Sequence, residues 1–221
     1  MQQLAPLFHM KIVTLSILST AVVVLAVPVA EPTPPGIPSA SSARTTLASL
    51  QVATPVDDGT YNRSLFHTWD IIHGKCNTRH VEIPLHNVVL IRDGEDVKTN
   101  RNCVPQSGIW TSPYDGLVFT EAHKLDIDHF VPLKNAWMSG ASEWTDEQRE
   151  AFANDLTHPQ LWAVSAHANR QKGDKGPDKW KPPLTSFYCT YAESWVDVKG
   201  YYNLTISDSE RDALGSMLDD C

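Results

Sequence analysis

The chain has 221 residues, of which 42% are hydrophobic and 20% charged, and its formal net charge is −8. This length is enough for one domain with a sizeable core. The acidic balance excludes a protein that coats nucleic acid non-specifically, because such proteins are usually basic.

Residues 1–30 are predicted to be a signal peptide. Lys11 precedes an apolar run that ends in the small residues of the segment 26–30, as expected before a cleavage site. The run is short for a membrane span, which disfavours a membrane anchor. Residues 31–44 are rich in Pro and Ser and are expected to form a linker or a propeptide. We therefore expect a secreted protein with a single domain at residues 45–221.

Four cysteines fit an oxidising compartment. None belongs to a C-x-x-C pair, so we expect two disulfides rather than a zinc site. Three pairings are possible, and proximity along the chain favours Cys76 with Cys103 and Cys189 with Cys221. Two Asn-x-Ser/Thr sequons are predicted glycan acceptors in a glycosylating host, at Asn62 and Asn203.

The first half of the domain is predicted to be mostly strand. Residues 43–52 predict a short helix that packs onto the domain. Residues 80–100 predict a strand, a turn at Asp93-Gly94 and a second strand. Residues 107–120 predict more strand around a Pro-Tyr-Asp-Gly turn.

The segment "KLDIDHFVPLKNAW" at residues 124–137 places charged groups among apolar ones. Asp126 and Asp128 are two apart and would share one face of a strand, with His129 on the opposite face. Pro132 indicates that the strand is already ending, so the imidazole can turn toward the same side. Such groups cost stability unless something uses them.

The second half is predicted to be mostly helical. Residues 145–155 begin with a capping-box pattern and predict a helix. Residues 160–164 predict a buried strand, and residues 165–173 a short helix closed by glycine. The last 35 or so residues predict two helices. Strands followed by helices indicate an α+β domain.

A strand, a second strand and a helix can fold so that the helix lies across the hairpin, with Asn169 facing Asp128. A carboxylate and an amide oxygen make an open oxygen site that suits Mg²⁺ or Mn²⁺. His129, beside the ion but not bound to it, could deprotonate an attacking water. This combination predicts cleavage of phosphodiester bonds.

The segments "CNTR", "DIDHFVPLKNAW", "FANDL" and "NRQKGDKGPDKWKPP", with the terminal cysteine, resemble secreted members of the HNH, or ββα-metal, nucleases. The resemblance spans residues 45–221, and its DH…NRxKxD part also resembles the HNH domain of RNA-guided DNA endonucleases. It implies a ββα-metal core with Asp128 and Asn169 as metal ligands and His129 as the general base.

One position departs from that pattern. The family usually has an asparagine before the second strand, whose side-chain carbonyl holds the imidazole of the base. This chain has Gln160 there, which could do the same, and Asn154 is a competing candidate. Asp126 is expected to support the ligands without binding the ion.

Residues 170–181 carry five basic residues against two acidic ones. This local patch predicts phosphate contact in an otherwise acidic chain, although a solvated loop would look the same. The predicted substrate-binding residues are Arg79, Arg170 and Lys172, and Arg79 could equally satisfy a carboxylate.

The predicted function is that of a secreted, monomeric endonuclease with one divalent ion, 5′-phosphate products and little sequence specificity. DNA is the preferred substrate. A secreted ribonuclease and a non-catalytic interaction protein with the same fold are the alternatives.

Overall fold

The computed structural model describes residues 33–76 and 79–221, without the side chains of residues 72–83. The predicted signal peptide lies outside this part. The described residues belong to one compact unit that begins at Pro32. None of the helices among them is both long and apolar enough to cross a membrane.

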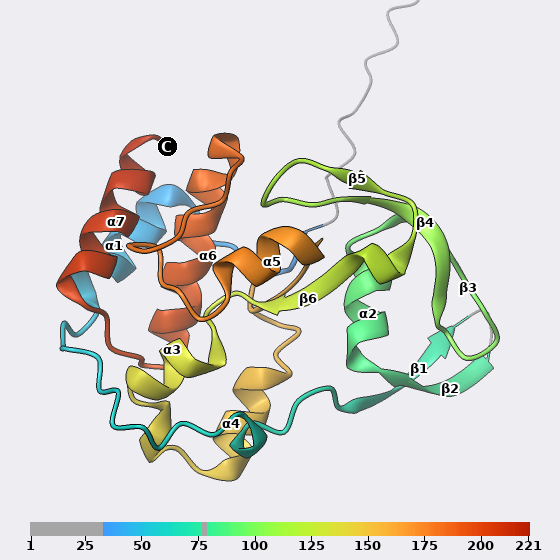
Figure 1. Cartoon of the computed structure of the whole chain (residues 1–221), viewed down its shortest axis with the longest axis horizontal. Helices are drawn as coiled ribbons and strands as arrows, with labels where there is room; N and C mark the ends of the chain where they lie inside the picture. Colours follow the sequence, from blue (N-terminus) through green and yellow to red (C-terminus); the bar gives the residue numbers. More distant parts are fainter. Residues whose placement is uncertain (1–32, 77–78) are drawn as a thin grey trace, which may run out of the picture. The chain divides into compact units, whose positions relative to one another are not determined.

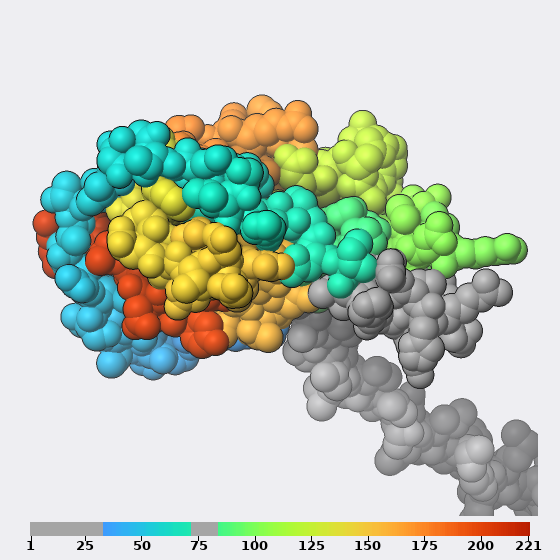
Figure 2. Space-filling view, turned by 90° about the horizontal axis from the view of Figure 1, so that it is seen from below, coloured from blue at the N-terminus to red at the C-terminus, as the bar shows by residue number. Residues whose placement is uncertain are grey.

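The strands form small antiparallel sheets, which together with the helices confirm the α+β prediction (Figure 1). The strands are β1 (Ile71–Cys76) with β2 (Arg79–Pro84), β3 (Glu95–Thr99) with β4 (Pro105–Thr111) and β5 (Val118–Phe119), and β6 (Leu125–His129) with β7 (Leu161–Ser165). Figure 2 shows the bright-green β3–β4 connection projecting from the rest of this unit.

Helices lie around the β6–β7 hairpin. In Figure 1, α1, α6 and α7 pack together as one group, while α5 lies across β6. The helices are α1 (Ala40–Ser49), α2 (Leu85–Arg92), α3 (Leu133–Met138), α4 (Asp146–Ala153), α5 (Ala166–Lys172), α6 (Tyr188–Tyr201) and α7 (Asp208–Asp219).

The hairpin of β6 and β7 lies between two hydrophobic cores. All five residues of β7 are buried. Trp162 and Val164 belong to the larger core, while Leu161 and Ala163 belong to the smaller one with Trp110. Since successive side chains of a strand point to opposite faces, a strand that is apolar on both faces is held from both sides. The hairpin is therefore a rigid base for the residues at its end.

The predicted strand after residue 84 is wrong, because residues 85–92 form α2. Leu85 and Val89 are buried four residues apart, on one helical face that covers the smaller core. This burial overrides the strand preference of the β-branched residues in the segment. A bend at Asp93 lies where the Asp93-Gly94 turn is predicted. A Cβ at Gly94 would lie 2.4 Å from Nε1 of Trp110.

Most other local predictions are confirmed. Capping boxes start α4 and α7, β7 and α5 follow as predicted, and Gly116 takes a φ of 70° in the predicted turn. The first helix begins earlier than predicted, at Ala40, inside the expected linker. Its N-terminus is capped by Ser39, and Ala43 is fully buried in the larger core.

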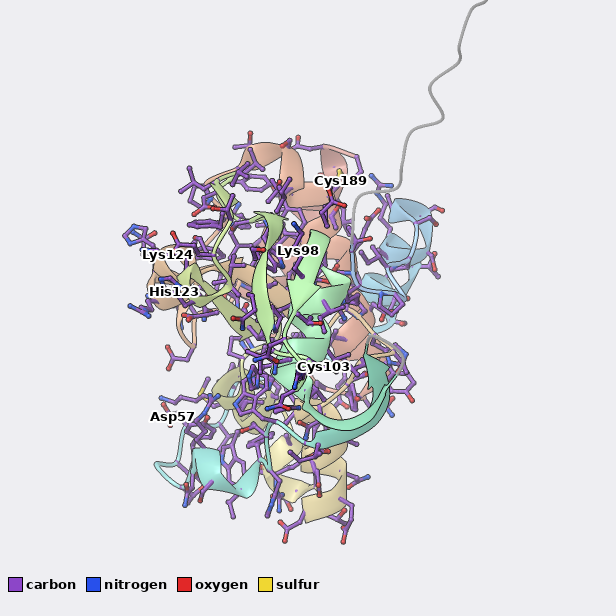
Figure 3. The ribbon with its side chains drawn as sticks, turned by 90° about the vertical axis from the view of Figure 1, so that its right-hand side faces the viewer. Asp57, Lys98, Cys103, His123, Lys124 and Cys189 are labelled. Atoms are coloured by element: carbon purple, nitrogen blue, oxygen red, sulfur yellow. A yellow bond between two sulfur atoms is a disulfide. The ribbon has the colours of Figure 1, made fainter. Side chains whose placement is uncertain are left out.

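The predicted disulfide between Cys189 and Cys221 is confirmed. Cys103 is also disulfide-bonded and lies well apart from Cys189 in Figure 3. The side chain of Cys76 lies outside the described part, so its pairing with Cys103 stays a prediction.

Candidate functional site

The predicted strand–strand–helix unit is formed by β6, β7 and α5. Asp128 lies opposite Trp162 in the antiparallel pair, and His129, opposite Leu161, ends β6. The helix α5 starts directly after β7, where the hydroxyl of Ser165 accepts a hydrogen bond from the amide of Ala168. It packs on both strands, which brings its side chains to the end of the hairpin.

Asp128, His129 and Asn169 line one cavity of about 330 Å³. Two further walls of this cavity carry positive charge, from Arg63 on the N-terminal side and Arg170 on α5. Residues that are more than 40 positions apart in the sequence therefore meet, as the predicted packing of the helix on the hairpin required.

His129 is held as a neutral imidazole. Its side chain is buried, and its Nε2 donates a hydrogen bond of 2.9 Å to the main-chain oxygen of Ala153. Within the described part of the chain, Nδ1 has no hydrogen-bond partner. Burial lowers the pKa of His129 to about 3, and the charges of Arg63 and Lys172 act in the same direction. The ring is thus fixed at one nitrogen, while the other nitrogen stays unprotonated and has no hydrogen-bond partner among the described residues.

Asp128 is buried and bonded through one oxygen. Its Oδ2 accepts a hydrogen bond of 2.5 Å from the hydroxyl of Tyr114 and lies 2.7 Å from Nζ of Lys172. Burial raises the pKa of Asp128, while Lys172 and Tyr114 act to lower it. The contacts with described residues leave Oδ1 available to the cavity.

Asn169 is oriented by the other aspartate of the strand. Its Nδ2 donates to Oδ2 of Asp126 at 3.2 Å. The amide oxygen Oδ1 of Asn169 is thereby left for another partner. Nε of Arg170 lies 3.7 Å from the same oxygen of Asp126, so this carboxylate links two consecutive residues of α5.

Neither candidate for holding the imidazole does so. Gln160 is fully buried and uses both ends of its amide on Val131, accepting from its N–H at 3.1 Å and donating to its carbonyl at 3.0 Å. It thus braces the chain after β6. Asn154 bonds the segment 67–70 instead. The carbonyl of Ala153 takes the place expected for a side-chain amide, and a main-chain atom leaves no signal in the sequence.

The predicted substrate-binding residues differ in their placement. The side chain of Arg79 lies outside the described part. Arg170 is exposed, beside Asp126. Lys172 is fully buried, with its Nζ on Asp128 and on the main-chain oxygen of His129 at 3.1 Å, so it cannot contact a substrate in the cavity. The two sequon asparagines are exposed, Asn62 and Asn203.

Arg63 is the residue that sequence reasoning missed. It follows Asn62, whose side chain caps a short 3-10 helix at Arg63–Leu65 and so fixes the arginine at the cavity. No described carboxylate forms an ion pair with Arg63. The sequence gives no signal that Arg63 belongs to a site, because the only motif that contains it is the glycosylation sequon.

The donors that could hold an ion are two oxygens, from Asp128 and Asn169. No group of three or more His, Cys, Asp or Glu side chains that could hold a metal occurs among the described residues. A site with two protein oxygens and an open cavity fits a hard ion that keeps several waters, such as Mg²⁺, rather than a closed zinc site.

One comparison with known proteins, the match to a family model, indicates a nuclease family. Residues 87–217 match the family described as GmrSD restriction endonucleases, C-terminal domain. A protein of Arthroderma benhamiae, named as an uncharacterized secreted protein, is 50% identical over 212 residues, covering 96% of this chain and 100% of the relative. No solved structure matches the chain. The prediction of secretion is confirmed by this relative, and the chain belongs to the family of the GmrSD restriction endonuclease C-terminal domain.

Proposed function

We propose that this secreted protein is a metal-dependent endonuclease of the HNH type that hydrolyses phosphodiester bonds with little sequence specificity. The observation that carries this proposal is the convergence of Asp128, His129 and Asn169 on one cavity at the end of a strand–strand–helix unit. Membership of a restriction endonuclease family supports the same reaction class.

His129 acts as the general base. A base must be unprotonated at working pH, and burial, which lowers the pKa of His129 to about 3, keeps it so before the substrate binds. A base is most effective when its pKa lies nearer the working pH, so the negative charge of the bound phosphate has to raise this pKa. The hydrogen bond from Nε2 to Ala153 places the ring proton on that nitrogen. Nδ1 then takes a proton from a water in the cavity, which attacks the phosphorus.

Asp128 and Asn169 hold the divalent ion, Mg²⁺ or Mn²⁺, through their free oxygens. When bound, the ion supplies charge stabilisation for the phosphate and the leaving 3′-oxygen, which yields 5′-phosphate products. Lys172 already balances the charge of Asp128 at 2.7 Å. We therefore expect weak ion binding, which tightens when a phosphate contributes further oxygens.

Arg63 binds the phosphate. A guanidinium that lines the cavity without a carboxylate partner lacks a counter-charge until an anion arrives, and its planar donors match two phosphate oxygens. Arg170 would contribute less, because Asp126 lies 3.7 Å from its Nε.

DNA is the proposed substrate, bound by a monomer. The positive charge near the cavity confines nucleic acid to this face of an acidic chain.

The test is digestion of supercoiled plasmid and of a long RNA by the purified secreted protein, with Mg²⁺ or with a chelator. We expect the plasmid to be nicked and linearised only when the ion is present, and His129→Ala to lose most of this activity, about 10²–10⁴-fold, with a measurable remainder. RNA cleavage alone would instead identify a ribonuclease. A folded protein inactive on both substrates would favour a non-catalytic interaction protein.

A further inference from the structure

Trp69 covers one side of the imidazole of the proposed base. The centroids of the Trp69 and His129 rings are 5.3 Å apart with planes inclined by 47°. The indole also contacts His86 of α2 edge-on, at 6.3 Å, and packs against the smaller core. It is thus supported from behind while it contacts His129.

The backbone of Trp69 adopts a conformation that a tryptophan rarely takes. Its φ is +68°, in the left-handed region that glycine favours and large side chains avoid. A residue stays in this region only when its surroundings hold it there, and such positions cluster at functional sites.

Asn154 is the group that holds it. Oδ1 of Asn154 accepts hydrogen bonds from two successive amides, those of Trp69 at 2.7 Å and Asp70 at 3.1 Å. Its Nδ2 donates to the carbonyl oxygens of His67 at 2.6 Å and Glu150 at 2.9 Å. One side chain therefore ties the turn that carries Trp69 to the last turn of α4.

Two consecutive residues at the end of α4 thus restrain the imidazole of His129, one directly and the other through Trp69. Ala153 accepts the hydrogen bond from Nε2 of His129, and Asn154 fixes the indole that packs on the ring. The hydrogen bond sets which nitrogen carries the proton, whereas the indole opposes rotation of the ring about the bond to Nε2. Both restraints fix the orientation of a ring that lines the cavity.

We propose that Asn154 and Trp69 are positioning residues for the general base, an inference that rests on the proposed function. Trp69 lies outside the segment that matches the family, residues 87–217.

The first experiment compares Trp69→Ala, Trp69→Phe and Asn154→Ala by plasmid cleavage. We expect Trp69→Ala and Asn154→Ala to lower kcat by about 10- to 100-fold with little change in KM, because a slightly misplaced catalytic group costs about that much. Trp69→Phe keeps an aromatic face and should retain most activity. Mn²⁺ binding, measured by calorimetry, should be unchanged in all three, since neither residue contacts a proposed ligand.

A loss of folding must be kept apart from a loss of positioning. Trp69→Gly relieves the backbone conformation but removes the ring, so it should unfold no earlier than Trp69→Ala and still lose kcat. If Trp69→Gly keeps full activity, the ring contact is not needed and the proposal is overturned.

The decisive test is a double-mutant cycle with His129→Ala. If Trp69 acts only through the imidazole, Trp69→Ala should have no further effect once His129 has been replaced. Equal losses in both backgrounds would overturn the proposal and leave a purely structural role. The proposed function fails separately, namely if His129→Ala by itself leaves cleavage intact.

Discussion

Nζ of Lys172 lies 2.7 Å from Oδ2 of Asp128 and 3.1 Å from the main-chain oxygen of His129. One buried cation thus joins α5 to both site residues at the end of β6. The hydroxyl of Tyr114 also donates a hydrogen bond to Asp128, so the carboxylate is held by groups from two separate parts of the chain. We infer that Lys172 maintains the site without touching the substrate.

Replacing Lys172 with Met should destabilise the protein by roughly 3–5 kcal/mol, because removing one partner leaves the other buried charge uncompensated. The side chains are 0% and 7% exposed for Lys172 and Asp128, so solvent cannot take over. Urea unfolding measures the loss. Lys175→Met is the matched control, since its exposed Nζ only contacts the carbonyl of Gln171. Similar small losses for both variants would contradict the role given to Lys172.

Metal binding should distinguish the proposed base, His129, from the proposed ligand, Asn169. His129→Ala and Asn169→Ala should both lose most cleavage activity, since a positioned base alone contributes about 10²–10⁴-fold. Titration of Mn²⁺ by calorimetry should show near-normal binding for His129→Ala and clearly weaker binding for Asn169→Ala. The reverse result would make the histidine a ligand.

Arg63→Ala should weaken phosphate binding without affecting the ion. A charge-assisted hydrogen bond contributes about 1.5–3 kcal/mol, so we expect kcat/KM to fall by roughly 10- to 100-fold. Arg101→Ala removes an equal charge from the exposed connection between β3 and β4 and serves as the control. If both substitutions reduce kcat/KM equally, net charge rather than the cavity position of Arg63 is responsible.

The buried imidazole should make folding sensitive to acid. Burial lowers the pKa of His129 to about 3 in the folded protein, from its usual value of 6.5. Between these values the unfolded chain binds more protons, so stability is full above pH 6.5 and is lost as the pH falls toward 3. At pH 4 the loss from this residue should be about 3 kcal/mol. His129→Gln, which does not titrate, should lose less stability than the wild type between pH 7 and pH 4 in urea unfolding. Parallel losses would mean that the imidazole is not excluded from solvent.

Much of the hairpin and helix unit could be predicted because its signals are local. The alternation around Asp126 and Asp128, the buried run of β7 and the glycine after α5 each determine the shape of a short segment. The prediction for residues 85–92 was wrong because the signal there is not local. Their apolar side chains suit either a strand or a helix, and only the shape of the smaller core selects α2.

The sequence by itself determined the order of β6, α4, β7 and α5 and the residue types at the end of β6, and it favoured the pairing of Cys189 with Cys221 that the structure contains. The tertiary structure alone decided which groups surround them. It buried Lys172 against Asp128 and gave the imidazole of His129 a main-chain partner at Ala153. From an earlier segment it brought Arg63 to the cavity and Trp69 against the imidazole. The physical reason is that burial and long-range hydrogen bonds depend on how distant segments pack. A pattern of side-chain types reveals neither which main-chain carbonyl will accept a hydrogen bond nor which arginine will lack a carboxylate partner.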